Sequence, residues 1–146
     1  MQRSTSPILM IIKMNIDLER IADQCVNIAE SASVFIKGNN IKPLEDFLKM
    51  SERVKTMVVD AINSFVKENT DLAKEVCEND EWVDDMNEKV IKHLITEISK
   101  DPGSVEKYSH LIRISHNFEK IADLATNIAE ETVYVVLGED IKHKKF

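Results

Sequence analysis

A motif of twelve residues occurs twice in this chain, one hundred residues apart. The first copy reads Glu-Arg-Ile-Ala-Asp over 19–23 and Asn-Ile-Ala-Glu over 27–30; the second reads Glu-Lys-Ile-Ala-Asp over 119–123 and Asn-Ile-Ala-Glu over 127–130. Positions 19–42 and 119–142 share 11 of 24 residues without a gap, which indicates a duplicated structural unit. A unit of one hundred residues does not fit twice into 146 residues. The chain therefore holds one whole unit and the rear part of another.

The composition predicts an all-α fold. Glycine and proline are scarce at three residues each, and charged residues make up 31% of the chain. Apolar residues recur at steps of three and four, the spacing of one buried face of a helix. The expected seams are Leu18, Ile21, Cys25, Ile28, Ala32 and Phe35; Leu44, Phe47, Leu48, Val54, Met57, Val58, Ala61, Ile62 and Phe65; Leu72, Val76, Val83, Met86, Val90, Leu94 and Ile98; Leu111, Ile114, Phe118, Ile121, Ala125, Ile128 and Val135.

Helix-breaking residues divide these seams into four long helices. The first is expected to start near Ser6-Pro7 and to end at Gly38, and the second to open at Pro43. The third follows the interruption at 69–70, with Thr70 or Asp71 as its cap, and stops at 101–103. Ser104 is expected to cap the fourth helix and Gly138 to end it. Short connections predict that consecutive helices run antiparallel.

The repeat and the helices together predict the domain organisation. Residues 42–146 form one complete three-helix unit, and residues 1–41 form the last helix of an incomplete preceding unit. That first helix carries a full apolar seam and must bury it. It packs either on its own three-helix unit, as a four-helix bundle, or on another subunit, which would give a homodimer.

Charge and the absence of targeting patterns limit the classes of function. The net charge of −7 argues against a nucleic-acid partner, because phosphate binding needs a basic face. The apolar run at 8–12 is too short for a signal-peptide core, and no segment approaches the ~20 apolar residues of a membrane span. Cys25 and Cys77 belong to no ligand pattern and are expected to be buried, reduced thiols. We expect a cytoplasmic protein.

The repeated motif places carboxylates in pairs on one helix face. Positions four apart lie about 40° apart around a helix, so Glu19 faces the same way as Asp23, and Glu119 the same way as Asp123. The third helix offers a matching pair, Asp80 and Asp84. If the third and fourth helices are antiparallel, the pairs on these two helices meet across a groove, where a hard cation would relieve the repulsion among four acids.

Other interpretations of these residues stay open. Acids four apart are usually a solvated helix face, and the recurrence of both copies weakens this interpretation without removing it. His116 lies three residues before Glu119 and is a possible further ligand, as in helical di-iron proteins. No phosphate loop, nucleophile–base pattern or cofactor fingerprint is present, so the sequence favours a non-enzyme.

The duplicated motif resembles the signature of the PhoU family, and the stretch from Asp71 to Asp84 resembles a further acidic segment of that family. The resemblance extends over nearly the whole chain. It implies a pair of three-helix bundles, of which this chain carries the second and the last helix of the first. It also implies metal binding by paired acidic motifs, with iron among the candidate ions. The implied ligands are Asp80, Asp84, Glu119 and Asp123, with Glu19 and Asp23 as the first-repeat motif.

The resemblance also implies a function. Proteins similar to PhoU regulate phosphate uptake together with a phosphate ABC transporter and a membrane histidine kinase of the phosphate regulon. Ala22 and Ala122 depart from the family pattern, which usually has glycine there. The partner acids of Glu19 and Asp23 are also missing from the chain. The alternatives are a metal-binding helical bundle with iron-storage or oxidase-like chemistry, and an accessory domain of another ion transporter.

Overall fold

The computed structural model describes residues 7–38 and 45–138, which form four long helices. These are α1 (Pro7–Gly38), α2 (Glu45–Val66), α3 (Thr70–Lys100) and α4 (Val105–Leu137). A short 3₁₀ turn, η1 (Pro102–Ser104), joins α3 to α4. No strand occurs in these two stretches. The predicted all-α fold is confirmed.

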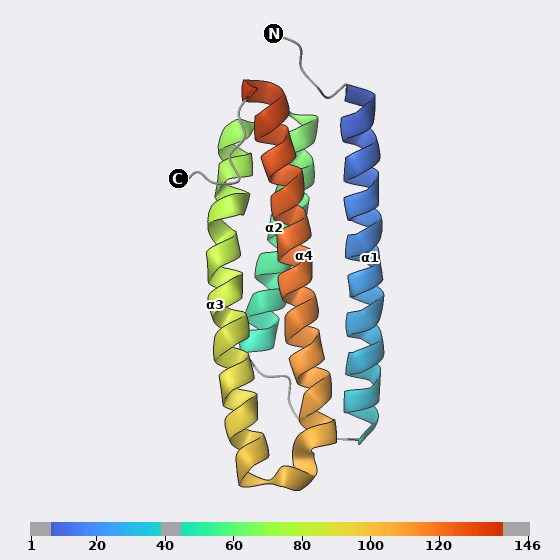
Figure 1. Cartoon of the computed structure of the whole chain (residues 1–146), viewed down its shortest axis with the longest axis vertical. Helices are drawn as coiled ribbons and strands as arrows, with labels where there is room; N and C mark the ends of the chain where they lie inside the picture. Colours follow the sequence, from blue (N-terminus) through green and yellow to red (C-terminus); the bar gives the residue numbers. More distant parts are fainter. Residues whose placement is uncertain (1–6, 39–44, 139–146) are drawn as a thin grey trace.

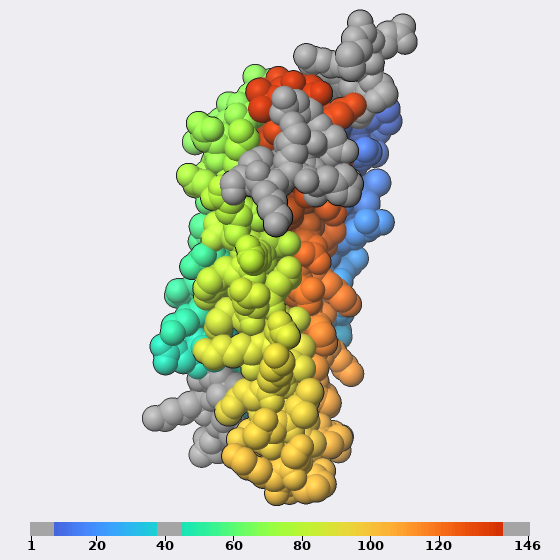
Figure 2. All heavy atoms as spheres, turned by 60° about the vertical axis from the view of Figure 1, so that its left-hand side comes forward, coloured from blue at the N-terminus to red at the C-terminus, as the bar shows by residue number. Residues whose placement is uncertain are grey.

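Consecutive helices run in alternating directions, and α4 lies at the centre of the arrangement (Figure 1). The backbone of α4 comes within 8 Å of α1, α2 and α3, and α2 also contacts α3. Among the described residues, α1 approaches only α4 to that distance. The helices α2, α3 and α4 thus form a three-helix bundle, and α1 packs on the opposite side of α4. Figure 2 shows the bundle from the side of α3, with α2 and α4 flanking it.

Small and branched side chains of α4 fill the core where the other helices meet it. Ala122, Ala125, Ala129 and Val133 are fully buried, and they let neighbouring backbones approach closely. The remaining core comes from the predicted seams together with Met10, Met50 and Ala73, which the seams did not include. Arg53 of α2 lies 4.3 Å from the ring centre of Trp82 of α3 and covers this edge of the core.

Among the described residues of the predicted seams, two are exposed. Cys25 is exposed, and Leu48 is 55% exposed. The prediction of a buried Cys25 is therefore wrong. Both residues line grooves beside α4 that no further helix covers, so an apolar side chain at the right helical spacing stays open there. Cys77 is half-buried, and burial raises the pKa of its thiol to about 12.

The helix ends follow the expected positions with two local changes. Asn69, rather than Thr70 or Asp71, caps α3, and its side chain accepts a hydrogen bond from the backbone N–H of Leu72 at 3.1 Å. Ser104 precedes α4 as expected, but its hydroxyl donates to the carbonyl of Asp101 instead of capping the helix. Gly138 ends α4 in the left-handed conformation with φ 68°. The expected starts at Ser6 and Pro43 lie outside the described residues.

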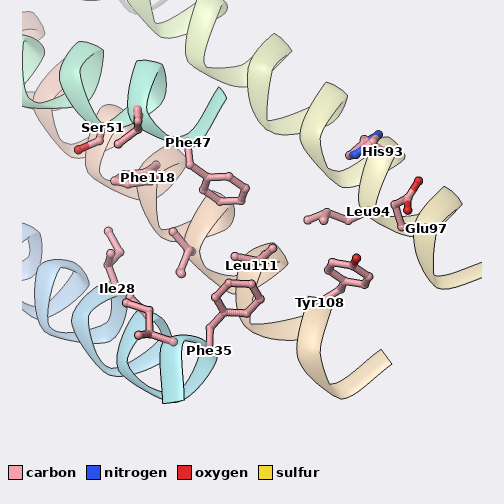
Figure 3. A pocket seen from close by; sticks show the side chains of 14 residues that line it. Ile28, Phe35, Phe47, Ser51, His93, Leu94, Glu97, Tyr108, Leu111 and Phe118 are labelled. Atoms are coloured by element: carbon pink, nitrogen blue, oxygen red, sulfur yellow. The ribbon is translucent and has the colours of Figure 1, made fainter. Parts of the chain in front are cut away.

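An apolar cavity of about 460 Å³ lies where all four helices come near one another. Phe35 of α1, Phe47 of α2, Leu94 of α3 and Leu111 of α4 converge on it (Figure 3). The cavity and a second apolar groove between α1 and α2 show that these two helices do not close against each other. None of the described helices has the length and apolar character needed to cross a bilayer.

Candidate metal centre

Three aspartates meet on the surface between α3 and α4. Asp80 and Asp84 lie one turn apart on α3, and Asp123 projects from α4 toward them. One carboxylate oxygen from each lies within 4.8 Å of the other two. The antiparallel packing of α3 and α4 therefore brings together three of the four acids expected to meet there, about forty residues apart in the chain.

Burial and mutual repulsion disfavour the charged forms of these aspartates. Burial, followed by the nearby charges of Asp123 and Asp84, raises the pKa of Asp80 to about 7. Burial and the charges of Asp123 and Glu119 raise the pKa of Asp84 to about 6. Burial also raises the pKa of Asp123, although a hydrogen bond with Asp80 opposes the shift. The repulsion among these carboxylates therefore favours the binding of a proton or a cation.

Glu119 belongs to the same surface but is held differently. Its Oε2 accepts a hydrogen bond of 2.8 Å from the side-chain amide of Asn87 on α3. The amide oxygen of Asn87 in turn accepts a hydrogen bond of 2.7 Å from the hydroxyl of Ser115. Asn87 and Ser115 are both buried, so this relay fixes the rotamer of Glu119 beside the three aspartates. Glu119 contributes to the raised pKa of all three.

His116 is close to Glu119 but not to the aspartates. Its Nδ1 lies 3.8 Å from Oε2 of Glu119, and its side chain is 50% exposed. Among the described residues it does not join the group of atoms within 4.8 Å. The aspartate group therefore consists of carboxylates alone.

The aspartate group fits a hard cation. Oδ1 of Asp80 is buried and has no hydrogen-bond partner among the described residues, a costly state for an acceptor unless a cation or water satisfies it. Oxygen-only ligands suit Mg²⁺, Ca²⁺, Mn²⁺ and ferric iron. A bound cation would neutralise the carboxylates and offset the repulsion that raises their pKa values.

The first copy of the motif has a different environment. Glu19 and Asp23 are exposed on α1, on the side away from α4, and within the described residues no third acid, histidine or cysteine joins them. Ala22 and Ala29 are exposed as well, whereas Ala122 and Ala129 at the matching positions of the second copy are fully buried. The two copies are therefore unequal: one faces a neighbouring helix, and the other faces solvent.

The buried polar residues that support this site do not belong to the motifs or seams predicted from the sequence. Asn87 lies between Val83 and Val90 on the buried face of α3, and Ser115 lies beside Ile114 on α4. A polar residue at a core position of a helix is a signal for such a role, because burial costs free energy unless a hydrogen bond compensates. Asn87 also follows Asp80 and Asp84 at steps of seven and three, on the same face.

The model of the PhoU domain family matches residues 1–32 and 47–132, which is most of the chain. The chain belongs to the PhoU family. This confirms the resemblance carried by the duplicated motif and by the acidic segment of α3.

Similar proteins with curated names are also PhoU homologs. The chain is 39% identical over 137 residues to a phosphate-specific transport system accessory protein PhoU homolog of Aquifex aeolicus, covering 94% of this chain and 62% of that protein. It is 38% identical over 125 residues to PhoU homolog 2 of Thermotoga maritima, covering 86% of this chain and 53% of the relative. The chain thus spans little more than half the length of these PhoU proteins.

Solved structures share the fold. The crystal structure of PhoU from Pseudomonas aeruginosa superposes with a TM-score of 0.86 at 29% identity, covering 94% of this chain and 69% of that one. A phosphate transport system regulatory protein PhoU from Streptococcus pneumoniae gives 0.82 at 26% identity over 92% of this chain. The predicted helical architecture of the family is therefore confirmed.

Proposed function

We propose that this PhoU-family chain acts in the regulation of phosphate uptake and of phosphate-regulon signalling. It does so by contact with a phosphate ABC transporter and a membrane histidine kinase at the cytoplasmic face, and not as an enzyme. Family membership over most of the chain carries this proposal, together with relatives named as accessory proteins of phosphate-specific transport.

The experiment is affinity purification of the tagged chain from cells grown in high phosphate. We expect the transporter's ATP-binding subunit and the sensor kinase to be enriched over a control bait, an unrelated helical bundle of similar charge. Recovery of neither protein would contradict the proposal. Enrichment of the subunits of a different ion transporter instead would favour the accessory-domain alternative.

We propose further that Asp80, Asp84 and Asp123, with Glu119 beside them, bind a metal ion. The supporting observations are the convergence within 4.8 Å and the unpartnered Oδ1 of Asp80. Glu19 and Asp23 would hold a metal only if another helix brought acids to the outer face of α1.

One observation bears on the alternative of oxidase-like iron chemistry. His116 lies 3.8 Å from Glu119 and would need to become a ligand of iron. In that case iron-loaded protein would consume oxygen, and the variant His116→Ala would lose this activity while keeping its fold, because His116 is half exposed. A regulator with a structural metal shows no oxygen consumption in the same assay.

We also propose that a second copy of the chain covers the outer face of α1. Ile8, Leu9, Ile12, Ile16 and Val26 are each more than 40% exposed on this helix. Soluble proteins rarely leave so many large apolar side chains of one helix in water. Such a homodimer would bury Ala22 and Ala29 as their counterparts on α4 are buried.

A further inference from the structure

A polar groove of about 480 Å³ runs between α1 and α4 and borders neither α2 nor α3. From α4, Arg113, Asn117 and Lys120 line it at steps of four and three, so they share one helix face. From α1, Ser31 and Glu30 line the opposite wall. The metal centre lies on the α3 side of α4, so this groove is a separate feature of the surface.

The wall of the groove contains hydrogen-bonding groups without partners. Asn117 is only 4% exposed, and its side-chain nitrogen Nδ2 is buried without a hydrogen-bond acceptor among the described residues. His110 also lines the groove, and its Nδ1 is likewise buried and unpartnered. A buried amide N–H without an acceptor is unfavourable, so an acceptor supplied by a ligand would be favoured here.

The charge of the groove is positive in a protein that is acidic overall. Arg113 and Lys120 are exposed, and within the described residues neither forms an ion pair. Glu30 is the only carboxylate among the lining residues, so two cationic side chains stand against one acid. The groove therefore attracts anions although the chain carries a net charge of −7.

The internal repeat supplies a comparison for this groove. The helices α1 and α4 carry the two copies of the repeat and run antiparallel (Figure 1). With the offset of one hundred residues, Lys13 corresponds to Arg113, and Glu131 corresponds to Ser31. The pair of Lys13 and Glu131 is therefore the counterpart of the pair of Arg113 and Ser31. At that matching place Lys13 forms an ion pair with Glu131 at 3.4 Å. A pocket beside this ion pair holds only about 10 Å³ and is also bordered by Phe65 of α2. The matching groove is thus closed and its cation is paired.

Two residue differences change the charge between the matching places. Ser31 replaces the partner acid Glu131, and Asn117 replaces the acid Asp17. Burial raises the pKa of Asp17, and the charges of Arg20, Glu131 and Lys13 all act on it, so acids and bases offset one another there. In the open groove both acids are exchanged for neutral hydrogen-bonding residues, while both cations are kept. Arg113 and Lys120 are therefore left for a ligand.

We propose that this groove binds a small oxyanion, with inorganic phosphate as its ligand. Arg113 and Lys120 supply charge, the guanidinium of Arg113 offers paired N–H donors, and the amide of Asn117 and the hydroxyl of Ser31 supply neutral hydrogen bonds. The groove itself supports an oxyanion independently of the metal centre, and the choice of phosphate as that oxyanion rests on the proposed function.

The test is calorimetric titration of the chain with inorganic phosphate in a low-salt buffer at neutral pH. The titration is repeated with the variant Asp123→Asn in the presence of a chelator, so that phosphate bound to a metal does not contribute. We expect binding in both cases, with sulfate competing and an equal ionic strength of chloride competing much less. No binding by either protein would overturn the proposal.

Arg113 and Lys13 occupy corresponding positions of the repeat, so variants of these two residues test the site against a matched control. Arg113→Gln should weaken phosphate binding roughly tenfold, since it removes a charge-assisted hydrogen bond, whereas Lys13→Gln should leave it unchanged. Ser31→Glu should abolish binding, because the new carboxylate would pair with Arg113 as Glu131 pairs with Lys13. Equal weakening by Arg113→Gln and Lys13→Gln would show diffuse charge attraction and overturn the site.

The same titration distinguishes free phosphate from a phosphoryl group on a larger molecule. Glycerol 3-phosphate carries the same dianionic group as a monoester. Binding of free phosphate as tight as or tighter than that of the monoester supports the assignment. Binding of the monoester roughly tenfold tighter would overturn the assignment to the free ion. Thermal unfolding of each variant confirms that it is folded before its binding is compared.

Discussion

At the scale of single residues, the proposed metal centre consists of carboxylates that are kept close at a cost in free energy. The raised pKa values of Asp80 and Asp84 show that their charged forms are disfavoured in the folded chain. A folded state that holds such repulsion is stabilised by a proton or a cation. The stability of the chain should therefore respond to both pH and metal.

The variant Asp80→Asn tests the response to pH in metal-free protein. The pKa of Asp80 is raised from 3.8 to about 7, so the folded chain binds this proton more tightly than the unfolded chain. The stabilisation from this proton is present below the unfolded pKa and is lost as the pH rises through about 7. We expect Asp80→Asn to gain stability over the parent chain progressively from pH 4 to 7. Urea unfolding at several pH values measures this; a constant difference would contradict it.

The relay through Asn87 predicts a coupling between packing and metal binding. Asn87→Ala removes the donor to Glu119 and leaves the buried hydroxyl of Ser115 without its acceptor. We expect a loss of about 1–3 kcal/mol of stability by urea unfolding. Metal affinity should fall roughly 10–100-fold, as is usual when a supporting hydrogen bond is removed. The exposed neighbour Glu88→Gln serves as a control and should change neither quantity.

At the scale of helices, the repeated motif has one sequence and two environments. On α4 its small residues face packed neighbours, and on α1 the same residues face water. The sequence predicted the four helices, their order and the meeting of the two acid pairs, because apolar spacing and stop residues report on local structure. It did not predict that Cys25 and Leu48 would be exposed, since their burial depends on which helices close against one another.

Buried polar residues could not be placed from the same spacing. Asn87, Ser115 and Asn117 interrupt apolar seams, and a sequence alone does not say whether such a residue turns outward or finds a partner inside. The structure shows that Asn87 pairs with Ser115 and Glu119, whereas Asn117 keeps an unpartnered nitrogen. The partner of each buried polar side chain depends on how neighbouring helices are aligned along their axes. The spacing of residues within one helix does not determine that alignment.

A matched substitution in the two copies tests how unequal they are. Ala122→Leu inserts a large side chain into a fully buried position and should destabilise the chain by about 1–3 kcal/mol. Ala22→Leu makes the same change on the exposed face of α1 and should alter the stability of the monomer by less than about 0.5 kcal/mol. Thermal unfolding of dilute protein compares them. Equal losses would show that the outer face of α1 is covered even in the monomer.

At the scale of the whole molecule, α1 is the element with the least support. It packs on α4 alone within the described part of the chain and presents a large apolar surface to solvent. The acidic motif on that surface stays incomplete unless another helix covers it. Whether the first motif gains partner acids therefore depends on whether the chain forms a dimer.

The homodimer proposal predicts a measurable change of mass. The double variant Ile12→Asp/Ile16→Asp charges the outer face of α1 at positions that are 48% and 44% exposed, so the fold should tolerate it. Light scattering should give a dimer for the parent chain and a monomer for the variant. Ile95→Asp, at a 52% exposed position on α3, is the control and should stay dimeric. A monomeric parent chain would rule the proposal out.

We predict that the two copies of the motif differ in metal binding, because within the described stretches partner acids reach the second copy and not the first. Elemental analysis of protein purified without chelator compares Asp123→Asn with Asp23→Asn. We expect Asp123→Asn to lose its bound metal and Asp23→Asn to keep the metal content of the parent chain. Unchanged metal in Asp123→Asn, or an equal loss in both variants, would contradict it.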